Sequence, residues 1–144
     1  MVEIPKPSVL ASVVQRLAFV CIFPAGALVV WGELATVGEL KGVNDKLQHL
    51  VAYFGLAFLT TLAFSGRRKL QGAVALVVMG AVLEILQGFV GRDPSILDAL
   101  TGAAGVVAGL VAGYAAAFVL ATLPDLPIVQ AALARYRARG TTPD

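Results

Sequence analysis

Four apolar segments, separated by shorter polar stretches, follow one another along the chain. They span about residues 9–31, 47–64, 70–90 and 96–123. Each is close to or above the roughly 18 to 20 residues that a helix needs to cross a bilayer. Only helices and closed barrels can span lipid, and these segments lack the alternation of barrel strands. The pattern predicts an all-α integral membrane protein, a bundle of four transmembrane helices in a single domain over residues 1–144.

The first segment also has features of a signal peptide. Lys6 precedes the apolar stretch, and Ala25-Gly26-Ala27 resembles a cleavage site. We interpret the segment as an uncleaved helix, in which Pro24 is expected to produce a kink.

Lys and Arg residues are distributed unevenly among the polar stretches. Eight lie in the N-terminal region, the turn at 67–69 and the tail at 124–144, and three lie in the other two loops. Because cytoplasmic loops carry the excess of positive charge, both termini are expected in the cytoplasm. The tail is expected to form a short basic helix at the inner membrane surface. The alternative is a basic chain end that only follows the charge rule.

Composition agrees with a membrane protein and excludes several classes of function. The 144 residues are 58% hydrophobic and only 14% charged, against about 25% charged in soluble domains. The mean hydropathy is +0.85. A net charge of +2 gives no basis for nucleic-acid binding, and no Gly-rich phosphate loop is present. Cys21 is the single cysteine, so no disulfide framework is expected.

Glu84 is the single ionisable residue of the third segment, and Gln87 follows it three positions later. A carboxylate within an apolar span is costly, so it marks a functional site with a polar partner. In the predicted topology, Glu84 lies near the outer end of its helix.

Other polar residues are expected at the same outer level. Asp45, His49 and Tyr53 share one helical face at the start of the second segment. The loop at 91–95 and the start of the fourth segment add further polar groups. The predicted outward-facing site comprises Asp45, Lys46, His49, Tyr53, Glu84, Gln87, Arg92, Ser95 and Asp98.

Each residue of this set also has a structural interpretation. Asp45 and Ser95 stand at positions typical of helix caps, and Ser95 with Asp98 forms a capping-box pattern. Lys46 and Arg92 are long enough to reach the lipid headgroups. The histidine and the glutamate could be hydrogen-bonded within the bundle. These interpretations do not explain why helical carboxylates occur only at the outer ends.

The fourth segment carries small residues at every fourth position: Thr101, Gly105, Gly109, Gly113 and Ala117. Such a stripe allows a neighbouring helix to approach closely. A helix of the same chain is the favoured neighbour, and a second copy of the chain is the alternative.

Two motifs resemble the signatures of the VanZ-like family of membrane proteins. The first is Asp45-Lys-Leu-Gln-His49-Leu-Val-Ala-Tyr53, and the second is Glu84-Ile-Leu-Gln87 with the polar residues that follow it. The resemblance extends over about residues 45–109. Gly102 stands where the family usually has Asn, four residues after an Asp. The residues that match the second motif beyond Gln87 are Arg92, Ser95, Asp98, Gly105 and Gly109.

The resemblance implies a multi-pass protein of the bacterial cytoplasmic (inner) membrane. The family is named for a protein associated with teicoplanin resistance. The first functional hypothesis is that the outer cluster binds or shields an amphipathic envelope component, a membrane lipid or a lipid-linked envelope precursor. The second is an enzyme acting on such a lipid, with His49 and Glu84 as acid–base candidates. The third is a structural or proton-linked scaffold.

No metal or other cofactor is expected. His49, Glu84, Asp45 and Asp98 are ligand types for a metal, but a single histidine without tight ligand spacing is a weak signal. The nearby lysine and arginine also argue against a cation. Ser95 has no base beside it in sequence, which disfavours a serine nucleophile.

Overall fold

The computed structural model describes residues 9–34 and 45–123, and within these ranges it is helical without strands. The prediction of an all-α fold is confirmed, and each helix bound lies within three residues of the expected one. The predicted basic helix of the tail at 124–144 lies outside the described residues. The four helices are α1 (Val9–Leu34), α2 (Asp45–Ala63), α3 (Arg67–Gln87) and α4 (Ile96–Thr122).

Three of the four helices, α1, α3 and α4, are long and apolar enough to cross a membrane. Their large apolar side chains point outward; Phe23, Val111 and Phe118, for example, are more than 60% exposed. Contiguous apolar surface of this kind is unfavourable in water and compatible with lipid. These are the features of a membrane protein.

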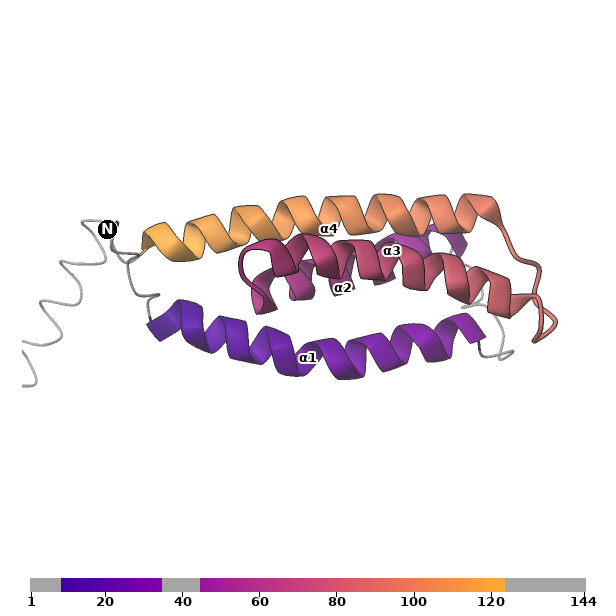
Figure 1. Cartoon of the computed structure of the whole chain (residues 1–144), viewed down its shortest axis with the longest axis horizontal. Helices are drawn as coiled ribbons and strands as arrows, with labels where there is room; N and C mark the ends of the chain where they lie inside the picture. The colour runs from indigo at the N-terminus through magenta and orange to yellow at the C-terminus, as the bar shows by residue number, and fades with distance from the viewer. Residues whose placement is uncertain (1–8, 35–44, 124–144) are drawn as a thin grey trace, which may run out of the picture.

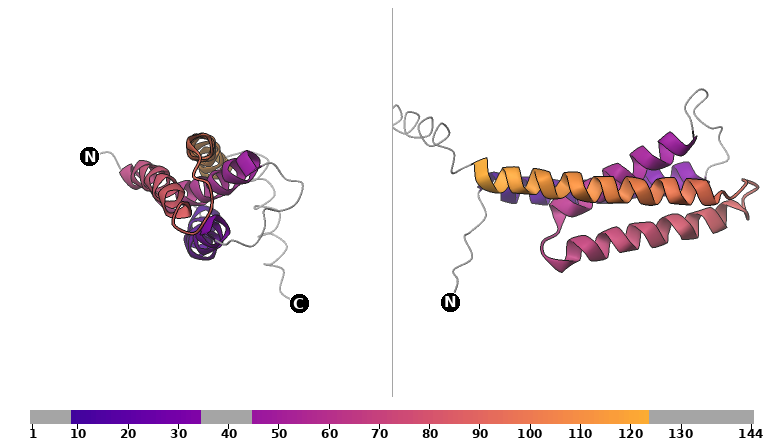
Figure 2. Two further views of the ribbon diagram at one scale, coloured as in Figure 1. Left: turned by 90° about the vertical axis from the view of Figure 1, so that its right-hand side faces the viewer. Right: turned by 90° about the horizontal axis from the view of Figure 1, so that it is seen from above.

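Successive helices run in alternating directions along the long axis of the molecule (Figure 1). The end of α1, the start of α2, the end of α3 and the start of α4 therefore lie at one end of the structure, the right-hand end in Figure 1. The view from above in Figure 2 shows α2 inclined to α4. The α2 helix contacts each of the other three and packs most extensively on α4.

The contact between α2 and α4 is made through the small-residue stripe. A Cβ added to Gly105 would collide with the main-chain oxygen of Leu50, and one added to Gly109 would collide with that of Phe54. The helix backbones are therefore close enough that a side chain does not fit between them. The stripe lies against a helix of the same chain.

The buried core is small and centred on α2. Tyr53, Ala57, Ala73 and Val106 form it, with contributions from α2, α3 and α4. Seven residues of α2 are buried, more than in any other helix. The one described helix that does not qualify as a membrane span thus occupies the centre, and the three that qualify pack against it.

Candidate functional site

Polar side chains from all four helices meet at the end where α2 and α4 begin. All nine residues predicted for the site belong to this half of the structure, together with every described carboxylate. At the opposite end lie Arg16 and the basic turn at 67–69, where Lys69 Nζ stands 4.7 Å from the ring centre of Tyr114. Acidic groups are therefore confined to one end of the described chain.

The central contact of the site joins α1 to α2. His49 Nδ1 lies 3.0 Å from Glu33 Oε1, and both side chains are less than a tenth exposed. On the other side of the ring, His49 Nε2 lies 3.8 Å from Asp45 Oδ1. Carboxylates on both sides of the imidazole fix its orientation.

Glu33 is not among the residues that the sequence predicts for the site. The first apolar segment is expected to end near residue 31, which places Glu33 in the following loop. In the structure α1 continues to Leu34, so Glu33 belongs to its last turn and is buried. One signal in the sequence could have identified Glu33. It lies directly after the apolar segment, so extending the helix by one turn would include it.

The end of α3 holds Glu33 in place. Gln87 Nε2 donates hydrogen bonds to Glu33 Oε2 at 2.6 Å and to the Glu33 main-chain oxygen at 3.1 Å. Arg92 Nη1 donates to the main-chain oxygens of Gly32 and Glu33 at 3.1 and 3.0 Å. A guanidinium at the carboxyl end of a helix also offsets the negative end of the helix dipole. Gln87 and Arg92 thus close the end of α1.

The backbone turn after α3 positions Arg92. Gly91 has φ +80°, a conformation that glycine adopts without strain. The Arg92 main-chain N–H donates to the Gln87 main-chain oxygen at 3.1 Å. The chain reverses here and brings the guanidinium back over α1.

Glu84 reaches from α3 to the start of α4. Its Oε2 accepts a 2.8 Å hydrogen bond from the main-chain N–H of Ser95, the residue at the N-cap position of α4. The Ser95 side chain makes no capping hydrogen bond, so the predicted capping box with Asp98 does not form at the Ser95 hydroxyl. Glu84 is 7% exposed, and its Oε1 has no hydrogen-bond partner among the described residues.

Asp98 and Lys46 pair across the start of α4 and α2. Lys46 Nζ lies 3.5 Å from Asp98 Oδ1, which is an ion-pair distance without hydrogen-bond geometry. The Asp98 side chain is 10% exposed and that of Lys46 is 48% exposed. This pair lies on the other side of His49 from Glu33.

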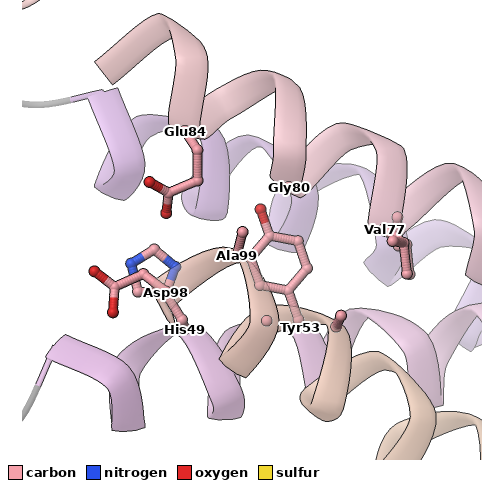
Figure 3. A pocket seen from close by; sticks show the side chains of 10 residues that line it. His49, Tyr53, Val77, Gly80, Glu84, Asp98 and Ala99 are labelled. Atoms are coloured by element: carbon pink, nitrogen blue, oxygen red, sulfur yellow. The ribbon is translucent and has the colours of Figure 1, made fainter. Parts of the chain in front are cut away.

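Tyr53 lies beside the His49 ring, one turn further along α2, and its hydroxyl reaches toward Gly80 of α3 (Figure 3). Its ring lies nearly parallel to that of His49, with centroids 6.5 Å apart. A Cβ at Gly102 would lie 3.1 Å from Tyr53 Cδ2, and one at Gly80 would lie 3.2 Å from its Cζ. Gly102, the position of the family's Asn, therefore leaves room for the tyrosine ring.

Cavities of very different size adjoin the cluster, including one of about 400 Å³ between α3 and α4 that Glu84 and Ser95 line. The cavity beside His49, Glu84 and Asp98 holds about 10 Å³, which is close to the minimum for one water molecule. A further one is a groove of about 690 Å³ between α1 and α2. Its wall is mostly apolar along both helices, and Glu33, His49 and Arg92 line its polar end. The groove has room for part of an acyl chain, whereas the small cavity does not.

This chain matches no protein-family model, no curated protein and no solved structure. The resemblance to the VanZ-like family rests on the motif residues alone and stays a prediction. Its two motifs contain all nine predicted site residues, and the fold brings these residues together in one half of the structure.

Proposed function

We propose that this protein is a four-span bacterial inner-membrane protein that binds an amphipathic envelope component, a membrane lipid or a lipid-linked envelope precursor. The observation that carries the proposal is the groove between α1 and α2. An apolar wall suits an acyl chain, and a group of charged side chains at one end suits a headgroup. The groove joins both kinds of surface in a single site.

The polar end of the groove offers donors and acceptors together. Arg92 has five N–H donors, and the bonds from Nη1 to α1 leave others to contact a headgroup phosphate. Glu33 and Asp45 are suited to amine or hydroxyl groups. The resemblance to VanZ-like proteins supports this assignment, because an envelope component held or shielded here would alter the access of a teicoplanin-type drug to its target.

Filling the groove tests the proposal. A Cβ at Gly55 would meet no atom within 4 Å, and Gly55 lines the groove. We expect Gly55→Leu to fold normally and to retain several-fold less phospholipid per chain after purification in mild detergent. Phosphorus analysis and mass spectrometry of the extracted lipid measure this. In cells, any protection from teicoplanin that the wild-type chain gives should fall in parallel.

The matched control is Gly26→Leu. Gly26 also has no atom within 4 Å of an added Cβ, but it does not line the groove. It should retain lipid and phenotype at the wild-type level. Equal lipid retention and protection in wild type, Gly55→Leu and Gly26→Leu would rule out the groove as the binding site.

A structural role for the cluster is the second candidate function. The contacts of Glu33 with His49 and Gln87 tie α1 to α2 and α3, as a scaffold requires. An enzymatic role has less support, since the cavity of about 10 Å³ beside His49 and Glu84 leaves no room for a reacting lipid group. A reaction would need the substrate to enter from the groove, which His49 lines, or from the cavity of about 400 Å³ between α3 and α4, which Glu84 lines.

The proposed topology places both termini in the cytoplasm and the polar cluster outside. The segregation of charge supports it, because the described end that carries no carboxylate is rich in arginine and lysine. Single cysteines at Arg68 and Asp93, both exposed, can be introduced on a Cys21→Ala background. We expect a membrane-impermeant thiol reagent to label position 93 and not position 68 in intact cells. The reverse pattern would invert the topology.

A further inference from the structure

The sequence alone gives only a weak signal for a metal, but the burial of Glu33 beside His49 strengthens it. Glu33, His49 and Glu84 each offer a ligand atom, and these atoms all lie within 4.8 Å of one another. All three residues are buried and come from three different helices. We propose that Glu33, His49 and Glu84 bind a divalent transition-metal ion of the Zn²⁺ or Mn²⁺ type.

Each carboxylate is oriented as a metal ligand should be. Glu33 Oε2 accepts a hydrogen bond from Gln87, and its Oε1 faces His49. Glu84 Oε2 accepts a hydrogen bond from Ser95, and its Oε1 is buried without a partner. One oxygen of each group is fixed by a protein donor. The other oxygen is unpartnered in Glu84 and lies 3.0 Å from His49 Nδ1 in Glu33. Such outer contacts orient the ligands of known metal sites.

The histidine shows the same arrangement. Its Nδ1 faces Glu33, and its Nε2 faces Asp45 at 3.8 Å. An imidazole that binds a metal through one nitrogen usually donates from the other to a carboxylate or carbonyl. Asp45 is therefore a positioning residue, while Nδ1 is the nitrogen that lies 3.0 Å from Glu33 Oε1.

The unpartnered oxygen of Glu84 is the observation that points to a ligand rather than to a closed network. Buried polar atoms nearly always have a partner. Figure 3 shows the Glu84 carboxylate directed toward the His49 ring. The adjoining cavity of about 10 Å³ is the size of a single water, which suits a fourth ligand completing the coordination shell.

The distances require only a small rearrangement. A tetrahedral ion with bonds near 2.1 Å separates its ligand atoms by about 3.4 Å. Glu33 Oε1 and His49 Nδ1 are already 3.0 Å apart, and the ligand atoms of all three residues lie within 4.8 Å of one another. One nitrogen and two carboxylate oxygens favour Zn²⁺ or Mn²⁺ over Mg²⁺ or Ca²⁺. Binding releases the proton held between Glu33 and His49.

A second group, Asp45, His49 and Asp98, shares the histidine and meets the same distance criterion. Its Asp45 side chain is a third exposed, and Lys46 already lies 3.5 Å from Asp98. A neighbouring ammonium opposes cation binding by charge repulsion. The group with Glu33 and Glu84 is therefore favoured.

The test uses the full chain, purified with a histidine-free tag on a Cys21→Ala background and stripped with chelator. Calorimetry with Zn²⁺ and with Mn²⁺, in excess Mg²⁺, measures stoichiometry and affinity. We expect one ion per chain. Glu33→Gln, His49→Asn and Glu84→Gln should each weaken binding at least tenfold. Asp93→Asn, an exposed carboxylate control, should leave it unchanged.

Three further measurements make the result decisive. Co²⁺ absorption on the wild-type chain should show tetrahedral coordination that is lost in Glu84→Gln, while circular dichroism and gel filtration verify folding. Asp98→Asn should bind within a few-fold of wild type; loss there with retention in Glu84→Gln would overturn the assignment. Gly55→Leu should still bind the ion, which separates this site from lipid binding in the groove. No binding to wild type above the Mg²⁺ background would also reject the proposal.

Discussion

Gly109→Leu is expected to lower the free energy of unfolding by about 3 kcal/mol or more, and to leave little folded protein after purification. At Gly109 a Cβ would collide with the main-chain oxygen of Phe54 and would lie 2.9 Å from the Ala57 Cβ. Main-chain atoms cannot move aside unless α2 and α4 separate, and that opens the core around Tyr53. Melting in detergent, followed by gel filtration after heating, measures the loss.

Gly26→Leu is the matched control, because it adds the same side chain to a helical glycine with no atom within 4 Å of the new Cβ. Its melting temperature should stay within a few degrees of wild type. A Gly109→Leu protein that melts like Gly26→Leu would mean that α2 and α4 are not in close contact.

Glu33→Ala is expected to destabilise the chelator-treated protein by about 3 to 5 kcal/mol, because it leaves one member of a buried pair without its partner. The change removes the carboxylate 3.0 Å from His49 Nδ1 and the acceptor 2.6 Å from Gln87 Nε2. Both donors are buried, so water does not readily replace the lost contacts. Thermal or denaturant unfolding in detergent measures the effect.

Glu33→Gln keeps the shape of the side chain and an oxygen for Gln87, and it should cost much less. Asp93→Asn removes an exposed carboxylate and should be neutral. If Glu33→Ala melts at the wild-type temperature, the Glu33–His49 pair does not hold α1 to α2. The scaffold candidate would then be rejected.

The apolar pattern predicts the helices well, because the same apolar segments supply both the outward-facing apolar side chains and the small buried core. The predicted bounds fail by a turn at the end of α1, and this error removes Glu33 from the predicted site. A carboxylate near the carboxyl end of a helix opposes the helix dipole, so local rules place it in a loop. Arg92, about sixty residues later, supplies the compensating charge, and no local pattern reveals that contact.

The predicted capping box at Ser95 fails for a related reason. Local spacing indicates that the serine hydroxyl and Asp98 close the start of α4. In the structure the Ser95 main-chain N–H donates its hydrogen bond to the Glu84 carboxylate of the preceding helix. Local patterns find the residue types and the end of the bundle at which they gather, but the partners depend on how three helices pack.

The central position of α2 has a consequence for how the chain enters a membrane. On the proposed topology α2 crosses the bilayer, yet it is absent from the three helices that qualify as spans by length and apolarity. Its first turns contain Asp45, Lys46 and His49, and these polar residues make insertion of α2 into lipid by itself unfavourable. Its main packing surface is α4, the last of the four described helices in the chain. On this topology we expect α2 to stay out of the lipid until residues 96–122 have been translated, so that α2 and α4 insert together rather than one by one.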